Sequence, residues 1–230
     1  VAQQTETDIT ALRKRKIAAG VQFAKSFNSD PHVLAVLRSI AEDQLAAIDI
    51  ESAVETAGLL VNRKPTPDNS YLLYGWKTIA NGEYDLKRYK VAEVAYQQLL
   101  LLPGLTADEQ TQYHNKQAMA VYQQAADLER AGKTEEAAAG FLRVAQVYPQ
   151  ADIRKNADFT AAALYLKLEK YTAAIPILTE FEARYPNDEL SATIPAKLAV
   201  AYEKTGDYTQ AAAQLEVISD HYAQKDKEMA

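Results

Sequence analysis

The stretch LAVAYEKTGDYTQAAAQLEVI, residues 198–218, decides the fold. Apolar residues recur every three to four positions on each side of Gly206 and Asp207, which predicts two amphipathic helices joined by a tight turn. Alanine occupies the corresponding place on each helix, at Ala199 and Ala211. A methyl group at the contact allows two helix backbones to cross closely. The segment is therefore predicted to form a helical hairpin.

The same pattern recurs along the chain in five pairs of helices. The two alanines of each pair are 12 residues apart: Ala41 and Ala53, Ala80 and Ala92, Ala125 and Ala137, Ala162 and Ala174, Ala199 and Ala211. A tyrosine opens the second helix at Tyr89, Tyr171 and Tyr208. Repeated hairpins bury their apolar faces against their neighbours, so the pattern predicts an all-α fold, a right-handed α-solenoid of stacked antiparallel helical hairpins.

These residues resemble the tetratricopeptide repeat, a helical hairpin with small residues at the helix contact and a proline at its end. The best matches are AAALYLKLEKYTAAIPILTEFEARYP and LAVAYEKTGDYTQAAAQLEVISDHYA. The resemblance covers residues 34–223 and is weakest in the first unit, where Ile48 replaces the turn glycine. It implies a superhelix without enzymatic activity, whose first helices line a concave groove for protein or peptide partners.

The repeat divides the chain into a predicted series of units. Residues 1–30 form an N-terminal helix, a remnant of a preceding repeat, and residues 224–230 form a tail. Between them, residues 31–223 form five units at 34–67, 73–106, 107–150, 151–187 and 188–223. Because a solenoid needs polar caps and QKDKEMA is too short to be one, we expect a fragment of a longer repeat protein.

One step of the repeat is longer than the others. Ala80 and Ala125 are 45 residues apart, and LPGLTADEQ lies between them. Thr106 and Glu109 have the spacing of a capping box, which predicts a long helix over 107–130. Pro176 falls early in a second helix, where it removes one backbone hydrogen bond.

Composition argues against several classes of protein. The net charge is −6, which disfavours nucleic acid as a partner, and no apolar run reaches the length of a membrane span. The chain has no cysteine. The basic run at 13–16 is interpreted as a solvated helix face.

No constellation of residues predicts catalysis. The histidines, His32, His114 and His221, share no ligand spacing, and Gly132-Lys133 lacks the preceding glycine of a phosphate loop. Acidic pairs at 135–136 and 188–189 are expected at helix starts, where they compensate the helix dipole. We therefore expect no enzymatic activity, no catalytic residue, no metal and no cofactor.

The concave groove is the predicted partner-binding surface. Its candidate contact residues are Arg38, Tyr74, Lys77, Asn81, Tyr84, Tyr122 and Phe159. Tyrosine and arginine are frequent hot-spot residues because they combine a large contact area with polar groups. Lys77 and Asn81 also look like the start of the carboxylate clamp of chaperone-binding tetratricopeptide domains. Gln123 then departs from the clamp pattern, so chaperone-peptide binding is not predicted.

Longer stretches resemble a narrower group of proteins. YKVAEVAYQQLLLLPGL and VAQVYPQADIRKNADFTAAALYLKLEKYTAAIPILTEFEARYPNDEL are similar to long tetratricopeptide proteins of Gram-negative bacteria associated with TonB- or Tol-type envelope systems. This resemblance implies a periplasmic scaffold that binds envelope energy-transduction proteins. Two alternatives stay open: a helical spacer or docking domain of a larger envelope enzyme such as a lytic transglycosylase, and a structural spacer whose groove binds nothing.

Overall fold

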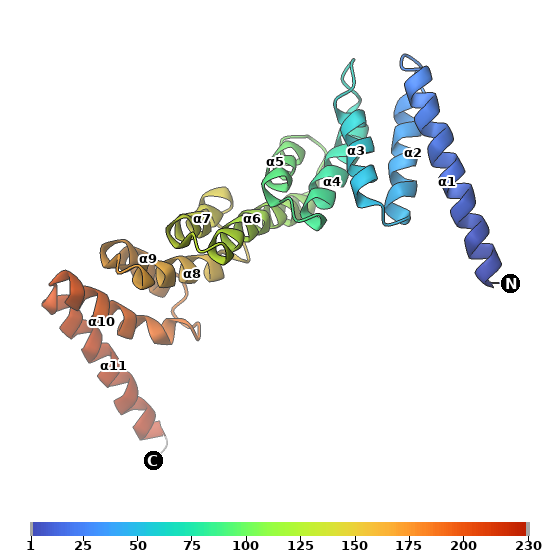
Figure 1. The fold of residues 1–230 in the computed structure, drawn as a ribbon. Helices are drawn as coiled ribbons and strands as arrows, with labels where there is room; N and C mark the ends of the chain where they lie inside the picture. Colours follow the sequence, from blue (N-terminus) through green and yellow to red (C-terminus); the bar gives the residue numbers. More distant parts are fainter. Residues whose placement is uncertain (1, 229–230) are drawn as a thin grey trace. The chain divides into compact units, whose positions relative to one another are not determined.

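The computed structural model describes the backbone of residues 2–228 and the side chains of residues 9–220 and Ala223. The described chain contains eleven α-helices, one short 3-10 helix and no strand (Figure 1). The helices are α1 (Ala2–Ser26), α2 (Val33–Ala46), α3 (Ile50–Val61), α4 (Asn69–Asp85), α5 (Tyr89–Leu100), α6 (Ala107–Arg130), α7 (Thr134–Val147), α8 (Arg154–Lys167), α9 (Tyr171–Arg184), η1 (Ser191–Thr193), α10 (Ile194–Thr205) and α11 (Tyr208–Glu228).

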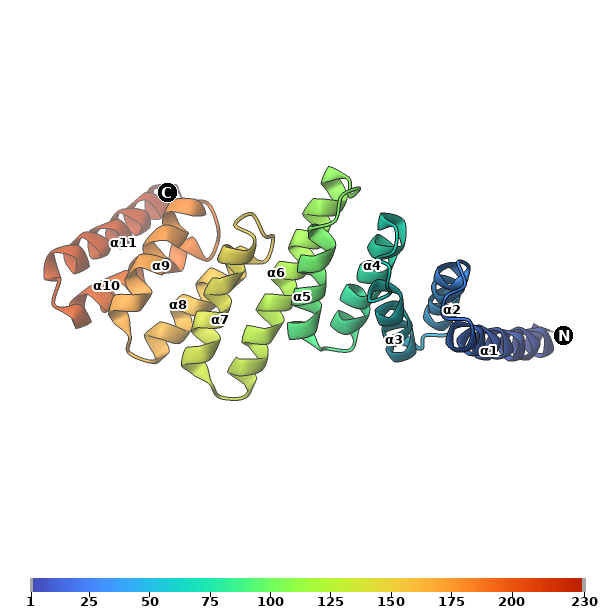
Figure 2. The same ribbon diagram turned by 90° about the horizontal axis from the view of Figure 1, so that it is seen from above.

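The chain divides into two compact units, Val1–Ala120 and Val121–Ala230. Consecutive helices pack against each other from α1 through α5 in unit 1 and from α7 through α11 in unit 2. Figure 2 shows the antiparallel hairpins of each unit from above. The prediction of an all-α fold built from stacked helical hairpins is confirmed.

The ten repeat alanines all lie in the interior, with exposed fractions between 0% and 8%. In unit 2, Ala162 packs in one apolar cluster with Leu178, Phe181, Ile194 and Leu198, which come from α9 and α10. The large side chains therefore fill the space on either side of the small residue at the helix crossing.

Five turns connect the helices of the hairpins, and each contains one residue with a left-handed backbone. The φ angles are 60° at Ile48, 60° at Lys87, 76° at Gly132, 57° at Glu169 and 82° at Gly206. In the last turn, the Gly206 N–H donates to the Glu203 carbonyl at 3.1 Å, and the Asp207 N–H donates to the Tyr202 carbonyl at 2.9 Å. The same pair of hydrogen bonds closes the other four turns. This is the Schellman motif, which satisfies the free carbonyls at a helix end.

The sequence predicted several local features correctly. α6 spans Ala107–Arg130, and its capping box is formed: the Thr106 N–H donates to Glu109 Oε2 at 3.0 Å, and the Glu109 N–H donates to Thr106 Oγ1 at 3.2 Å. Tyr89, Tyr171 and Tyr208 are the first residues of α5, α9 and α11. Pro176 lies inside α9, which continues to Arg184.

The expectation for the acidic pairs was correct for one and wrong for the other. Glu135 and Glu136 lie in the first turn of α7. Asp188 and Glu189 lie in the connection between α9 and η1 instead. There Asp188 forms an ion pair with Lys155 of α8 and accepts a hydrogen bond from the Leu190 N–H at 3.0 Å, so its role is to fix this connection.

Ile48→Gly is expected to raise the free energy of unfolding by about 1 kcal/mol. A left-handed backbone costs a β-branched residue about 1–2 kcal/mol, which exceeds the entropic cost of glycine in the unfolded chain. Ile48 is 83% exposed, so little packing is lost. Urea unfolding measures the change. Ala47→Gly is the matched control: its φ is −90°, so glycine there relieves no strain and should be destabilising.

Ala162→Leu is expected to lower the free energy of unfolding by about 1–3 kcal/mol, because the added atoms have no space at the helix crossing. Ala199→Leu should act in the same direction. Ala163 is the next residue of α8 and is exposed. Thermal melting of Ala163→Leu therefore provides the control, and equal melting temperatures for Ala162→Leu and Ala163→Leu would contradict close packing at the crossing.

Candidate partner-binding surface

Polar and aromatic side chains lie along the first helices of unit 1. It consists of Arg38 on α2, Tyr74, Lys77 and Asn81 on α4, and Tyr113 and Lys116 on α6, and is called the first-helix face below. Four of the seven predicted contact residues belong to it. The structure brings Arg38 against Tyr74, and it places Lys77 and Asn81 farther along the same helix as Tyr74.

Arg38 and Tyr74 form the part of this face between α2 and α4. The Arg38 guanidinium lies 4.8 Å from the centre of the Tyr74 ring, and its Nε donates to Glu42 Oε1 at 2.9 Å. Burial raises the pKa of the Tyr74 hydroxyl. The guanidinium side chain is about half exposed, at 46%. This pair offers a partner a flat cation on an aromatic ring that is already in position.

Lys77 and Lys116 flank Tyr113 between α4 and α6. Each Nζ lies 5.6 Å from the centre of the Tyr113 ring. Lys77 also forms an ion pair with Glu109 at 2.7 Å. This hydrogen bond, followed by that from the Thr106 N–H, lowers the pKa of the Glu109 carboxyl. The capping residue of α6 thus holds Lys77 in place.

Asn81 is bound within the chain. Its Oδ1 accepts hydrogen bonds from the Tyr96 hydroxyl at 3.0 Å and from Lys116 Nζ at 2.8 Å. Tyr96 is 1% exposed, and this burial raises its pKa. A ligand that used the Asn81 carbonyl oxygen would have to compete with both donors, which agrees with the sequence argument against a carboxylate clamp.

The three remaining predicted residues lie among aromatic side chains. Tyr84 packs edge-on against Tyr89, with ring centres 5.3 Å apart. In unit 2, Tyr122 lies 4.9 Å from Phe141, and Phe159 lies 5.6 Å from Phe181. The Phe159 ring also has Lys197 Nζ at 5.7 Å from its centre. Each of the three rings is half-buried and fills space next to the core.

Sequence reasoning missed Glu109, Tyr113 and Lys116. The alanine register placed Tyr122 as the α6 counterpart of Lys77, because both lie three residues before the repeat alanine. The contacts with α4 are made instead by the earlier part of α6, which includes the added turns. The long spacing between Ala80 and Ala125 was the signal that could have identified this part of the helix.

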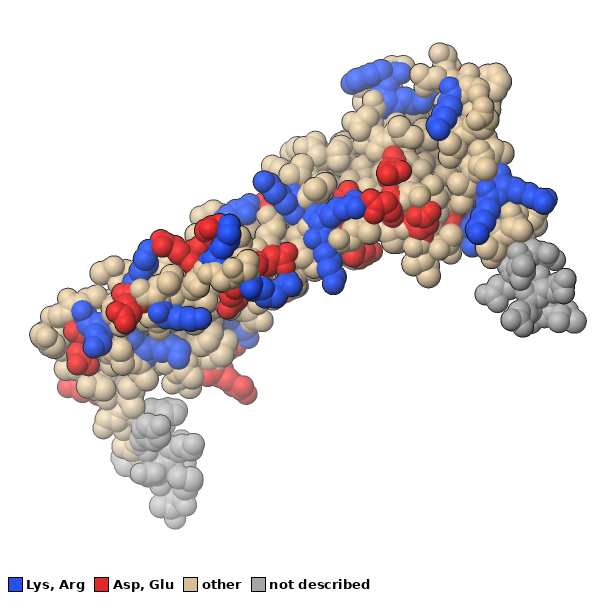
Figure 3. Space-filling view, in the orientation of Figure 1, with Lys and Arg blue, Asp and Glu red and all other residues tan. Residues whose placement is uncertain are grey.

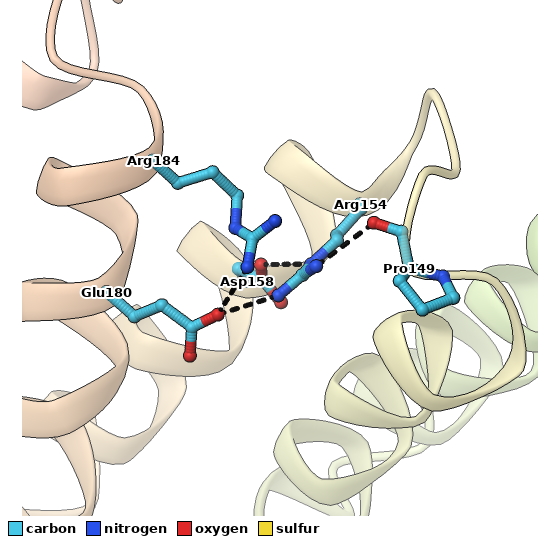
Figure 4. A network of polar contacts seen from close by, with 5 residues as sticks. All are labelled: Pro149, Arg154, Asp158, Glu180 and Arg184. Carbon is cyan, nitrogen blue, oxygen red and sulfur yellow. Dashed lines mark hydrogen bonds and ion pairs between the residues drawn. The ribbon is translucent and has the colours of Figure 1, made fainter.

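Unit 2 contains a separate polar network, drawn in Figure 4. Arg154 on α8 is 7% exposed and binds three groups: Asp158 at 3.1 Å, the Pro149 carbonyl at 3.0 Å and Glu180 of α9 at 2.8 Å. Arg184 also donates to Glu180, at 2.8 Å. One buried guanidinium thus ties α8 to α9 and to the preceding connection.

Burial and pairing act in opposite directions on the two carboxyls of this network. Burial raises the pKa of Asp158, and Arg154 offsets part of that effect. The hydrogen bond from Arg184 is the main cause that lowers the pKa of Glu180. A hollow of about 250 Å3 lies beside them, and Leu142, Pro176 and Ile177 line its apolar side. The network adds polar contacts to the apolar packing of Ala162 against Leu178 and Phe181 between α8 and α9.

Two segments of the sequence match a known family model. The family model described as "Tetratricopeptide repeat" matches residues 119–151 and 197–225. The first segment includes the α6–α7 turn at Gly132, and the second includes the α10–α11 turn at Gly206. The second of them includes the stretch of sequence from which the hairpin was predicted. No curated protein matches the sequence.

Three solved structures are similar to this chain. A crystal structure of MamA is 14% identical, covers 82% of this chain and 97% of its own, and has a TM-score of 0.39. A tetratricopeptide repeat protein from Parabacteroides merdae is 14% identical over 90% of this chain and 79% of its own, with a TM-score of 0.35. YrrB, described as a TPR protein with an unusual peptide-binding site, is 12% identical over 86% of this chain and 91% of its own, with a TM-score of 0.37.

Within the residues that the structure describes, no group of three or more His, Cys, Asp or Glu side chains could hold a metal ion. None of the described helices is both long and apolar enough to cross a membrane. His221 of the three histidines lies outside the residues whose side chains are described. The first-helix face offers the partly exposed cations of Arg38 and Lys77 and the half-buried ring of Tyr74, whereas Tyr113 is 8% exposed and lies beneath the two lysines.

Arg154→Met is expected to lower the free energy of unfolding by about 3 kcal/mol at pH 7, because it leaves Asp158 buried without its cation. Since the pKa of Asp158 is already raised in the folded state, protonation favours folding. The difference in free energy of unfolding between Arg154→Met and the unmodified protein should therefore shrink as the pH falls through the pKa of Asp158 in the folded state. Urea unfolding at pH 7 and pH 4.5 measures it. Arg184→Met, which removes a partly exposed contact, should cost less than about 1 kcal/mol.

Proposed function

We propose that this tetratricopeptide protein is a scaffold without enzymatic activity, which binds a protein or peptide partner on the first-helix face of unit 1. The observation that carries the proposal is the arrangement of cations on aromatic rings: Arg38 on Tyr74, and Lys77 and Lys116 around Tyr113. Arginine and tyrosine are enriched among residues that dominate binding energies. Here they are held in position before a partner arrives, which lowers the entropic cost of binding.

We further propose that the scaffold works in the bacterial periplasm as part of a TonB- or Tol-type system. The support is the similarity of the stretches at 89–105 and 144–190 to envelope-associated tetratricopeptide proteins. The partners would then be envelope energy-transduction proteins.

The spacer alternative has its own supporting observation. Lys77 is paired with Glu109, and Asn81 accepts two hydrogen bonds from Tyr96 and Lys116. A surface whose polar groups are satisfied within the chain can serve to join neighbouring helices alone. A helical spacer or docking domain of a larger envelope enzyme would need no more than this.

Crosslinking capture from Gram-negative extracts distinguishes these functions. The bait is the full 230-residue chain, compared with Arg38→Ala and with Lys90→Ala. Lys90 is exposed on α5 and lies outside the first-helix face, so it is the matched control. We expect a TonB- or Tol-type protein to be captured from the periplasmic and membrane fractions by the unmodified chain and by Lys90→Ala.

The captured protein is then titrated against the three purified chains. Arg38→Ala should weaken binding at least fivefold, which corresponds to a hot-spot contribution of about 1 kcal/mol. Equal affinities for all three chains would show that the interface lies outside the first-helix face. Partners found in the cytosolic fraction alone would contradict the envelope assignment, and no specific capture would favour the spacer.

A further inference from the structure

Unit 1 contains a second candidate site, separate from the first-helix face. It is a cavity of about 550 Å3, and none of its lining residues belongs to that face. Val21 and Leu37 lie at its apolar side together with Leu59. The volume is in the range of pockets that bind small ligands or single side chains of a partner.

Helix periodicity explains how the cavity is formed. Val21, Ala24 and Lys25 lie on one side of the last turns of α1, and Asn28 follows them in the connection to α2. Thr56 and Leu59 of α3, with Arg63 beyond its end, lie on the opposite wall. Positions spaced by three, four and seven residues share one side of a helix. The cavity is thus the groove between α1 and α3, with Leu37 of α2 contributing to its lining.

Three cations surround this groove: Lys25, Arg63 and Lys64. No carboxylate is among the lining residues, although the whole chain carries a net charge of −6. Elsewhere in unit 1, Lys16 pairs with Asp43 and Arg88 pairs with Glu51. At the upper end of unit 1 in Figure 3, near the α3–α4 connection, blue side chains occur without red ones beside them.

The helix ends do not cancel this charge. α1 and α3 both end beside the cavity, and each C-terminus carries the equivalent of about half a negative charge. Three full positive charges exceed that sum. Like charges gathered at one site repel each other, and an anionic partner relieves this repulsion. The groove therefore selects for an anion that also carries an apolar group.

We infer that this groove binds an acidic peptide segment of a protein partner, with an apolar side chain in the cavity and carboxylates on Lys25, Arg63 and Lys64. The two carboxamides of the lining, Asn28 and Asn62, favour a peptide over a lipid. Asn62 Nδ2 donates to the Gly58 carbonyl at 2.9 Å, and its Oδ1 can accept from a backbone N–H. Leu59 is 63% exposed at the mouth of the groove, where it can pack against the bound segment.

Fluorescence anisotropy with the labelled peptide acetyl-EELFEE tests the inference on the full chain. We expect saturable binding that weakens as the salt concentration rises from 50 mM to 300 mM, because surface charges are screened. The peptides acetyl-EESSEE and acetyl-KKLFKK, which lack the apolar pair and the negative charge, should bind at least tenfold more weakly. Absence of acetyl-EELFEE binding at 1 mM would overturn the proposal.

Variants separate the groove from general electrostatic attraction. Arg63→Glu with Lys64→Glu should weaken acetyl-EELFEE binding at least tenfold, and Leu59→Ser should weaken it at least threefold. The matched control is Lys14→Glu with Arg15→Glu, the same change of charge on exposed residues of α1 that do not line the cavity. An equal loss in the control pair would show nonspecific attraction and overturn the assignment of the groove.

Two further measurements distinguish a peptide from a lipid and this groove from the first-helix face. Cosedimentation with phosphatidylglycerol vesicles tests a lipid: vesicle binding that needs Arg63 and Lys64, without peptide binding, would overturn the peptide proposal. Arg38→Ala should leave acetyl-EELFEE affinity unchanged, because Arg38 lies on the first-helix face. Loss of peptide binding to this groove can therefore be distinguished from loss of partner binding to the first-helix face.

Discussion

Each hairpin depends on one residue whose backbone is left-handed. That residue lies in the connection of two or three residues that joins the two helices. The paired hydrogen bonds of the Schellman motif satisfy carbonyls that would otherwise be free at the helix end. With the reversal fixed in this way, the repeat alanines of both helices are buried, and larger side chains pack around them.

The five hairpins differ in the type of residue at the left-handed position of the turn. Glycine adopts the left-handed conformation without strain, and it is present in two turns, at Gly132 and Gly206. These are the two turns contained in the segments that the family model recognises. Ile48, Lys87 and Glu169 adopt the same backbone conformation in the other three hairpins. The geometry of the repeat is thus kept where its sequence signature is weaker.

Much of the fold could be predicted because its determinants are local. The helix periodicity, the tyrosines that begin second helices, and the Thr106–Glu109 capping box all act over a few residues. The long α6 followed from a single irregular spacing. Asp188 was misplaced because its role depends on Lys155, which lies 33 residues earlier in the chain. A sequence pattern with helical period carries no information on such a contact.

The candidate surface was less predictable for the same reason. Arg38 and Tyr74 could be placed together from the repeat register, since they come from the first helices of adjacent hairpins. Lys116 could not, because the register was counted from Ala125 and the added turns of α6 shift which residues reach α4. The cavity between α1 and α3 was not predicted, because Lys25 precedes the first repeat unit and Arg63 and Lys64 follow α3 in the connection to α4.

The packing of each helix on its sequence neighbours has a consequence for how the protein folds. Almost every tertiary contact within a unit joins segments close in the chain, so little loop-closure entropy is lost before contacts form. Such a chain behaves as a row of coupled segments, in which order can start at any hairpin and spread to the adjacent ones. A hairpin that opens locally therefore disturbs the hairpins packed against it, while more distant hairpins can keep their amide hydrogens protected.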